Sequence, residues 1–292
     1  NILLSGPPGS GKTMLAKSLK NLLPALSEDE IVEVTKLHSL GEHTIINNPI
    51  VDRPFRSPHH TASRASIIGG GSKVQPGEIS LAHRGVLFLD ELLEYPRTVL
   101  ESLRQPLEDH EITVSRANGK FNFPANFLLV ATMNPCPCGF LGDPEKTCIC
   151  SQNQILNYQK RLSGPLLDRI DLTVSVSRVP HEKLLNNKMS TKSQQETFLS
   201  EIHKAYSIQR DRYKCSYKYN NDIPSSNVDK ITSISESAKT FLTNAARKLD
   251  LSTRSYFKVI KVSRTIADLE GSTSIEVPHI AESLQYRQIS IG

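Results

Sequence analysis

The chain has 292 residues, enough for one large domain or two of ordinary size, and its 38% hydrophobic content excludes wholesale disorder. No apolar run is long enough to span a membrane, and no secretory leader is visible. The net charge of +5 permits contact with nucleic acid without requiring it. Because the first residues have the pattern of a core strand, we expect the natural protein to carry a further N-terminal portion.

The first motif is a phosphate-binding loop of the form G-x-x-x-x-G-K-[ST]. It consists of Gly6, Pro7, Pro8, Gly9, Ser10, Gly11, Lys12 and Thr13. An apolar run precedes it and a helical pattern over 14–23 follows, so an ordinary glycine turn is the weaker alternative. Backbone amides and a helix N-terminus favour phosphate, Lys12 can reach the β- and γ-phosphates, and Thr13 can ligate Mg²⁺. The loop predicts ATP and Mg²⁺ as ligands.

The next segments predict a helix and an insertion. A helix is expected over 27–38, with Ser27 as its cap and Glu30 completing a capping box. An extended prolyl segment, 53–61, contains His59 and His60, for which a structural or interface role is favoured over metal binding because adjacent extended side chains face opposite ways. A short helix over 62–68 and a glycine-rich loop follow. The insertion over 62–85 is long enough to have a function of its own.

A buried parallel strand is expected over 86–89, and two acids follow it directly. Asp90 would hold Mg²⁺, directly or through water, and Glu91 would act as general base on the attacking water. Many strands end in acids, so this pattern gains its weight from the phosphate-binding loop upstream.

A helix opened by Pro96 should present Val99, Leu103 and Leu107 on one face. Residues 111–124 then predict a β-hairpin around the turn Asn118-Gly119. Arg116 and Lys120 flank its tip and are candidates for contact with a nucleic-acid backbone. Two solvated charges on a sheet edge are the alternative.

Another buried strand, 127–132, should deliver Asn134 beside Asp90 and Glu91, where it could orient water or sense the γ-phosphate. Four cysteines follow within fifteen residues: Cys136, Cys138, Cys148 and Cys150. Four thiolates satisfy tetrahedral Zn²⁺, and structural zinc is the favoured interpretation. An iron–sulfur cluster and free or redox-active thiols are the alternatives, because the C-x-C spacing is tighter than the usual C-x₂-C.

The predicted fold class is α/β, with a parallel sheet flanked by helices and a small helical domain at the C-terminus. A last strand is expected over 170–176, directly after Arg169. We expect an α/β nucleotide-binding domain over 1–178, a polar linker over 179–228 with one helix over 196–213, and a helical lid over 229–292. In the lid, Ser252 or Thr253 should cap a helix that ends at Gly271.

A phosphate loop, an acidic strand, an Asn-ended strand and a helical lid together resemble an AAA+ ATPase. The amino-acid sequences of residues 53–60, 76–85 and 263–271 resemble those of the Mg-chelatase-like branch. The cysteine cluster and the segment 161–171 resemble the bacterial ComM/YifB type. The resemblance covers nearly the whole chain and is weak only over 186–228.

The resemblance implies roles that spacing alone does not assign. Asn134 matches sensor 1, Arg169 the arginine finger that acts on ATP in the neighbouring subunit, and Arg254 the sensor 2 of the lid. The 62–85 insertion resembles the helix-2 insert, and the 111–124 hairpin resembles the pre-sensor-1 hairpin. The family implies a homo-hexameric ring that works on single-stranded or branched DNA as a helicase, preceded by a Lon-like domain. A cytoplasmic location is expected for a nucleotide-dependent enzyme without a leader.

Two other functions compete with the DNA motor. One is the motor subunit of a magnesium chelatase, which remodels a protein partner during metal insertion into a porphyrin; the four-cysteine cluster argues against it. The other is a nucleotide-gated scaffold that scarcely hydrolyses ATP, against which the intact Asp90-Glu91 pair argues.

Overall fold

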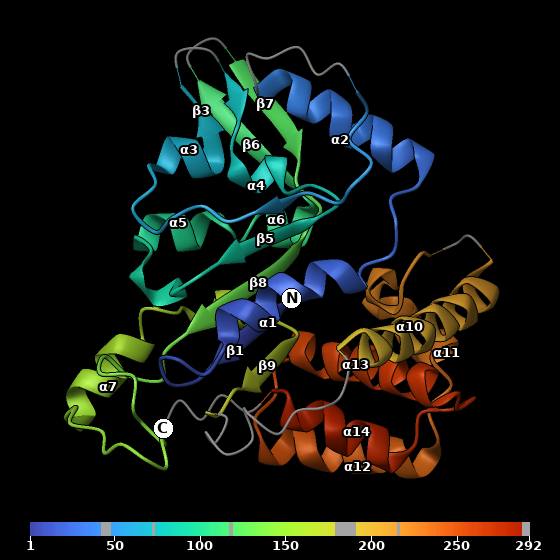
Figure 1. Ribbon diagram of the computed structural model, residues 1–292. Helices are drawn as coiled ribbons and strands as arrows, with labels where there is room; N and C mark the ends of the chain where they lie inside the picture. Colours follow the sequence, from blue (N-terminus) through green and yellow to red (C-terminus); the bar gives the residue numbers. More distant parts are fainter. Residues whose placement is uncertain (42–47, 72–73, 117–118, 179–190, 215–216, 288–292) are drawn as a thin grey trace. The chain divides into compact units, whose positions relative to one another are not determined.

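The computed structural model describes residues 1–41, 48–71, 74–116, 119–178, 191–214 and 217–287 (Figure 1). By the density of contacts the chain forms two compact units, one built mainly from residues 1–185 and the other from 186–289. The predicted boundary between residues 178 and 179 falls at the edge of a segment outside the described residues. Across the described part of the chain, no helix is both long and apolar enough to cross a bilayer.

The first unit is built on a parallel five-stranded sheet with the order β2-β5-β8-β1-β9 (Figure 1). The strands are β1 (Ile2–Ser5), β2 (Phe55–Arg56), β5 (Val86–Leu89), β8 (Leu128–Met133) and β9 (Leu172–Ser175). Leu89 lies opposite Ala131, and Ser5 lies opposite Met133. The carboxyl ends of β1, β5 and β8 therefore reach the same edge of the sheet. The predicted α/β fold of AAA+ type, with its parallel sheet and C-terminal helical part, is confirmed.

Helix α1 (Lys12–Leu19) packs on the central strands and continues into a short 3₁₀ turn, η1 (Lys20–Leu22). Its Ala16 is fully buried against a cluster that includes Leu4, Phe88 and Val130. Burial of these apolar side chains fixes the end of β1 relative to the start of α1. The phosphate-binding loop between them is thus held at both ends by the core.

Helix α2 (Glu28–Gly41) begins with the predicted capping box. Ser27 N donates to Glu30 Oε2 at 3.2 Å, and Glu30 N donates to Ser27 Oγ at 3.4 Å. The inserted segment that follows β2 contains helix α3 (Arg64–Ile68), the antiparallel pair β3 (Gly69–Gly70) and β4 (Gln75–Pro76), and helix α4 (Glu78–Leu81). The short helix predicted over 62–68 is present.

The helix expected after Pro96 is divided in two, so that prediction was wrong in its continuity. Helix α5 (Arg97–Ser102) ends before α6 (Pro106–Asp109) begins. Pro106 has no amide hydrogen to continue the first helix and instead opens the second. The predicted hairpin is present as β6 (Glu111–Arg116) and β7 (Gly119–Pro124), with Arg116 paired to Gly119. Its two tip residues lie outside the described part.

Three further short elements complete the first unit. The 3₁₀ turn η2 (Leu92–Glu94) follows β5, helix α7 (Gln152–Gln159) follows the cysteine-rich loop, and helix α8 (Gly164–Leu167) precedes β9. Ser151 caps α7 with a full capping box, which fixes the end of the cysteine-rich loop.

The second unit is helical. Its elements are α10 (Thr191–Tyr213), η3 (Asn220–Asp222), η4 (Ser225–Asn227), α11 (Val228–Ile231), α12 (Glu236–Lys248), α13 (Thr253–Glu270) and α14 (Val277–Gln285). Ser252 caps α13 and Gly271 ends it in a left-handed conformation, as predicted. Residues expected to form a polar linker contribute to its core, where Tyr213 and Ile223 pack with Leu242 and Val259. The predicted helix over 196–213 is present and begins five residues earlier.

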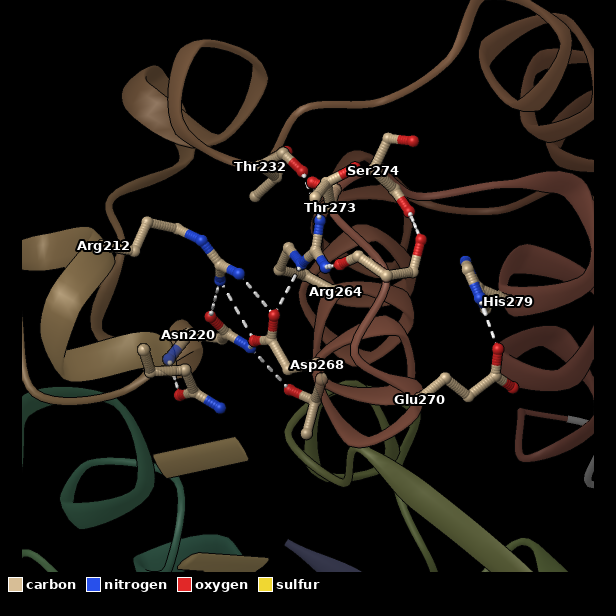
Figure 2. A network of polar contacts seen from close by, with 12 residues as sticks. Arg212, Asn220, Thr232, Arg264, Asp268, Glu270, Thr273, Ser274 and His279 are labelled. Atoms are coloured by element: carbon tan, nitrogen blue, oxygen red, sulfur yellow. Dashed lines mark hydrogen bonds and ion pairs between the residues drawn. The ribbon is translucent and has the colours of Figure 1, made fainter. Parts of the chain in front are cut away.

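A buried ionic network holds this unit together (Figure 2). Arg264 of α13 is fully buried; its guanidinium donates to the carbonyl oxygens of Thr232 and Thr273 and lies 3.0 Å from Asp268 Oδ1. Arg212 of α10 pairs with the same carboxylate. A buried charge is tolerated only where its partners satisfy it. The motif 263–271 is therefore accounted for by its contacts within the second unit.

Candidate functional site

The phosphate-binding loop runs from the end of β1 to the first residue of α1. Gly9 and Gly11 have φ values of 78° and 84°, a left-handed conformation that L side chains rarely adopt. An added Cβ at either position would meet nothing within 4 Å. Backbone conformation, and not lack of space, therefore requires glycine at both positions.

Lys12 lies within the cradle formed by this loop. Its Nζ donates to the carbonyl oxygens of Gly6 at 2.7 Å and Pro7 at 2.8 Å, and lies 3.4 Å from Asn134 Oδ1. Burial lowers the pKa of Lys12 below its ordinary value of 10.5, while the nearby carboxylate of Asp90 opposes that change. The ammonium group is thus held in place among oxygen atoms beside the expected phosphate position.

Asp90 follows β5 and is gripped by hydroxyl groups from two other elements. Thr13 Oγ1 donates to Asp90 Oδ2 at 3.1 Å, and Thr132 Oγ1 donates to Asp90 Oδ1 at 2.5 Å. Thr132 lies on β8 and is 1% exposed. The sequence did not indicate a role for Thr132. The strand register explains its position, because Leu89 pairs with Ala131 and the next residues of the two strands, Asp90 and Thr132, are therefore neighbours.

Glu91 has a strained backbone and an open side chain. Its φ of 52° is in the left-handed region, uncommon for a residue other than glycine. Its amide donates to Thr132 Oγ1 at 3.0 Å, and its side chain is 57% exposed. Its carboxylate oxygen Oε2 lies 3.9 Å from Nδ1 of His60. Glu91 follows Asp90 directly in the chain, with its carboxylate open to solvent.

His60 thus joins this edge of the sheet, which its sequence position did not indicate. The rings of His59 and His60 lie 4.1 Å apart, and His60 lies edge-on to Tyr95. Tyr95 in turn donates to the carbonyl of Pro58 at 2.6 Å. Among the described residues the two histidines do not form part of a candidate metal cluster.

The four cysteines after β8 converge into one cluster. Their sulfur atoms all lie within 4.8 Å of one another. The Sγ atoms of Cys136 and Cys138 are 3.4 Å apart, those of Cys136 and Cys148 are 3.7 Å apart, and those of Cys138 and Cys148 are 3.6 Å apart. Tetrahedral zinc with Zn–S bonds of about 2.3 Å places its sulfurs about 3.8 Å apart. The separations are too long for a disulfide and close to those of a zinc site.

Backbone amides support the sulfur atoms of this cluster. Cys138 N donates to Cys150 Sγ at 3.4 Å, and Leu141 N donates to Cys136 Sγ at 3.3 Å. Burial raises the pKa of Cys136 to about 12, whereas backbone amide donors lower the pKa of Cys138 to about 6. The donor set and its spacing fit one Zn²⁺.

Of the two arginines predicted to act on nucleotide, Arg169 belongs to the first unit and Arg254 to the second. Arg169 donates to Arg104 O at 3.0 Å and Pro165 O at 2.7 Å, and pairs with Glu108. Arg254 is an exposed residue in the first turn of α13, in the second unit. At the hairpin, Lys120 is exposed on β7, and the side chain of Arg116 lies outside what the structure describes.

Comparison with known proteins assigns this chain to a family. Residues 1–184 match the family described as magnesium chelatase, subunit ChlI, and residues 190–287 match its C-terminal family. The chain belongs to the magnesium chelatase family. Members of this family are AAA+ ATPases, which typically oligomerise.

Within the magnesium chelatase family, the resemblance to the ComM/YifB type is confirmed. The chain is 45% identical over 288 residues to competence protein ComM of Haemophilus influenzae, covering 98% of this chain and 55% of that protein. It is 40% identical over 290 residues to the uncharacterized protein YifB of Salmonella typhimurium, covering 99% and 56%. Magnesium-chelatase subunit ChlI of Bigelowiella natans is 27% identical over 156 residues, covering 46% and 43%. The chain thus spans a little over half the length of its more similar curated relatives.

Proposed function

We propose that this protein is a subunit of a ring-forming motor that hydrolyses ATP with Mg²⁺ and couples hydrolysis to movement on DNA. One observation carries the ATPase part of the proposal. Lys12, Thr13, Asp90, Glu91 and Asn134 come from three separate segments and meet at one edge of the sheet. That edge lies at the carboxyl ends of the strands, where open α/β sheets bind ligands.

The loop residues would bind the triphosphate. Backbone amides of residues 6–13 would surround the phosphates, and Lys12 would neutralise charge on the β- and γ-phosphates. Thr13 and Asp90, already in contact with each other, would hold the metal ion. Bound Mg²⁺ supplies neutralisation of the charge that develops on the phosphate oxygens.

Glu91 and Asn134 would manage the attacking water. The exposed carboxylate of Glu91 would accept a proton from that water as general base. Asn134, within reach of Lys12, would orient the water or sense the γ-phosphate. Glu91 follows β5 and Asn134 follows β8, so the sheet positions each of the two groups separately.

Arg169 and Arg254 would complete the site. The resemblance assigns Arg169 to ATP held by a neighbouring subunit. Its guanidinium, on a side chain that is 11% exposed, is bound to Glu108 and to the carbonyl oxygens of Arg104 and Pro165, and it would exchange these partners for the phosphate. A homo-hexameric ring would supply that neighbour. Arg254 of the lid would sense the nucleotide and convert its state into a domain rotation.

The DNA part of the proposal rests on resemblance and on charge. Arg116 and Lys120 would face phosphate groups of single-stranded or branched DNA in the centre of the ring, and the name of the H. influenzae relative supports a role in competence. A helicase or branch-migration activity in transformation or recombination would use both side chains to hold DNA. Such a motor would work in the cytoplasm. The four cysteines would hold a structural Zn²⁺.

The second candidate is the motor subunit of a magnesium chelatase. The similarity to the ChlI subunit of B. natans favours it, but covers less than half of this chain. In that case a protein partner, and not DNA, would stimulate hydrolysis. A scaffold that binds ATP without hydrolysing it is the third possibility.

ATP turnover measured with and without single-stranded and branched DNA tests the proposal. We expect Mg²⁺-dependent hydrolysis that DNA stimulates. Replacement of Glu91 by Gln should lower turnover by about 10²–10⁴-fold and leave ATP bound, because it removes the general base. Glu94→Gln, three residues away and paired with Arg161, is the matched control. Undiminished turnover of Glu91→Gln would remove the assigned base, and stimulation by chelatase partner subunits alone would favour the second candidate.

A further inference from the structure

The cysteine-rich loop lies directly against the phosphate-binding loop. A Cβ added to Gly139, between Cys138 and Cys148, would lie 2.7 Å from Cδ of Pro8. Gly139 has a φ of 83°, so its backbone can approach Pro8 in a conformation that other residues rarely adopt. The two loops therefore pack at van der Waals distance, and a shift in one displaces the other.

The same two loops are bridged by Arg178, which follows β9. Its Nη2 donates to the carbonyl oxygen of Pro8 at 3.4 Å, and its Nε lies 3.1 Å from Oδ2 of Asp143. The side chain of Asp143 is fully buried, and its other oxygen, Oδ1, accepts from the amides of Glu145 and Lys146 at 2.8 and 3.0 Å. Arg178 thus connects the loop between the two cysteine pairs to the phosphate cradle.

One aromatic contact and one ion pair fix the guanidinium in this bridge. The side chain of Arg178 lies over the ring of Phe140, 5.4 Å from its centroid, and Nη1 lies 3.5 Å from Oε2 of Glu145. Lys146 lies over the same ring at 5.0 Å, but among the contacts of the described residues it is Arg178, and not Lys146, that reaches the phosphate-binding loop. Arg178 and Lys146 therefore share the Phe140 ring, but Arg178 also contacts Pro8, Asp143 and Glu145.

Neither a phosphate-binding motif nor a cysteine motif assigns a role to Arg178. We propose that Arg178 is a positioning residue that couples the four-cysteine loop to the phosphate-binding loop, so that metal bound by the cysteines raises nucleotide affinity. The inference rests on the proposed function, because it assumes that residues 6–13 bind nucleotide and the cysteines a metal ion.

A chain of contacts connects the metal site to the nucleotide site. Metal binding fixes the four sulfur atoms and with them the loop that contains Asp143. A fixed Asp143 holds Arg178, and Arg178 holds the carbonyl of Pro8 in the phosphate-binding loop. Nucleotide then binds a loop whose conformation is already selected, which reduces the ordering that binding requires. Coupling between binding sites is reciprocal, so nucleotide must also raise metal affinity by the same factor.

The test measures affinity for a fluorescent ADP analogue with Mg²⁺ in the wild type, Arg178→Ala, Arg178→Lys and Asp143→Asn, with Lys146→Ala as control. We expect Arg178→Ala and Asp143→Asn to weaken binding on the order of tenfold, within the usual range of coupling between sites. Arg178→Lys should fall between Arg178→Ala and the wild type, because it keeps the charge but not the planar fork. Lys146→Ala should bind as the wild type does.

Zinc content and chelation separate coupling from general damage. Arg178→Ala should keep its zinc and its melting temperature. Removal of zinc by a chelator should weaken nucleotide binding of the wild type by about the same factor and have little further effect on Arg178→Ala. In the reverse experiment, the ADP analogue should raise zinc affinity in the wild type and not in Arg178→Ala.

The outcomes distinguish the two proposals. A wild-type protein that binds no nucleotide overturns the proposed function and this inference together. A wild-type protein that binds nucleotide, with affinity independent of zinc or equal in Arg178→Ala and Lys146→Ala, overturns the coupling alone. Equal weakening of the wild type and Arg178→Ala by chelation would likewise exclude Arg178 as the connection.

Discussion

Thr13 Oγ1 donates a hydrogen bond to Asp90 Oδ2 at 3.1 Å, although 77 positions separate the two residues in the chain. The contact joins the first turn of α1 to the end of β5. Thr132 completes it from β8 by donating to the other carboxylate oxygen. The two proposed metal-binding residues are thus fixed relative to each other by the fold itself, with a third residue setting the orientation of Asp90.

Replacement of Thr132 by Val should raise the Mg²⁺ concentration required for half-maximal ATP turnover on the order of tenfold. The change removes the donor to Asp90 and leaves the carboxylate less well oriented, and loss of a partner of a metal ligand has effects of this size. Turnover at varied Mg²⁺ measures it. Thr132→Ser keeps the hydroxyl group and should resemble the wild type; equal behaviour of Val and Ser would contradict the role.

Replacement of Arg169 by Ala should reduce ATP turnover by about 10³-fold or more at little cost in nucleotide affinity, since fingers act on transition-state charge. Arg161→Ala is the control, because Arg161 pairs with Glu94 instead. A mixture of Arg169→Ala with Lys12→Ala subunits should recover part of the activity, as each supplies what the neighbour lacks. No recovery in rings that do form would show that Arg169 does not act across an interface.

The purified protein should contain about one zinc ion per chain, as expected for four thiolate ligands. Cys136→Ser and Cys148→Ser should lose the metal and melt at a lower temperature, since the cluster closes the loop before α7. Cys215→Ser, which changes the cysteine outside the described residues, is the control. Elemental analysis measures the metal content, and thermal unfolding measures the melting temperature. A metal-free wild type that melts at the same temperature as the Cys136→Ser and Cys148→Ser variants would contradict the zinc proposal.

Arg116→Glu with Lys120→Glu should weaken DNA binding and flatten its dependence on salt, without change in basal ATP turnover. Protein binding releases counterions from the DNA, and fewer are released when a phosphate contact is lost. The logarithm of the affinity therefore falls less steeply with the logarithm of the salt concentration. Lys36→Glu, an exposed cation on α2, is the charge-matched control for Lys120→Glu alone. Equal DNA affinity in the Lys36 and Lys120 variants would return the hairpin charges to the solvated-edge interpretation.

The first unit should lose stability as the pH falls, in part through His83. Its Nδ1 accepts from the amide of Asn126 at 3.0 Å, and Nε2 lies 3.2 Å from Oε2 of Glu33. Burial lowers the pKa of His83 below its ordinary value of 6.5; Glu33 and Glu30 oppose this and Arg84 adds to it. The unfolded chain therefore binds the proton more readily than the folded one.

The contribution of His83 is complete above a pH of about 6.5 and is lost as the pH falls through the lowered pKa. Thermal unfolding between about pH 7 and pH 5 should show a smaller decrease in melting temperature for His83→Gln than for the wild type. His59→Gln, which removes an exposed imidazole, should retain the wild-type dependence. An identical decrease in all three proteins would contradict the assignment.

Local pattern was enough to predict the elements whose cause is local. The glycines and Lys12 of the phosphate-binding loop, the box formed by Ser27 and Glu30, and the hairpin around residue 118 each depend on neighbours a few positions away. The divided helix after Pro96 shows the limit even here, because the apolar spacing continued through Pro106 while the backbone could not.

The sequence by itself determined which chemical groups the site contains: a phosphate-binding loop, two acids at a strand end, an Asn at another and four thiols. Only the tertiary structure decided which side chains surround them, because strand order and register bring together residues far apart in the chain. Thr132 beside Asp90, His60 beside Glu91 and Arg178 beside Pro8 have no signature in spacing. Their proximity arises from packing of parallel strands and loops at one sheet edge, which no local pattern encodes.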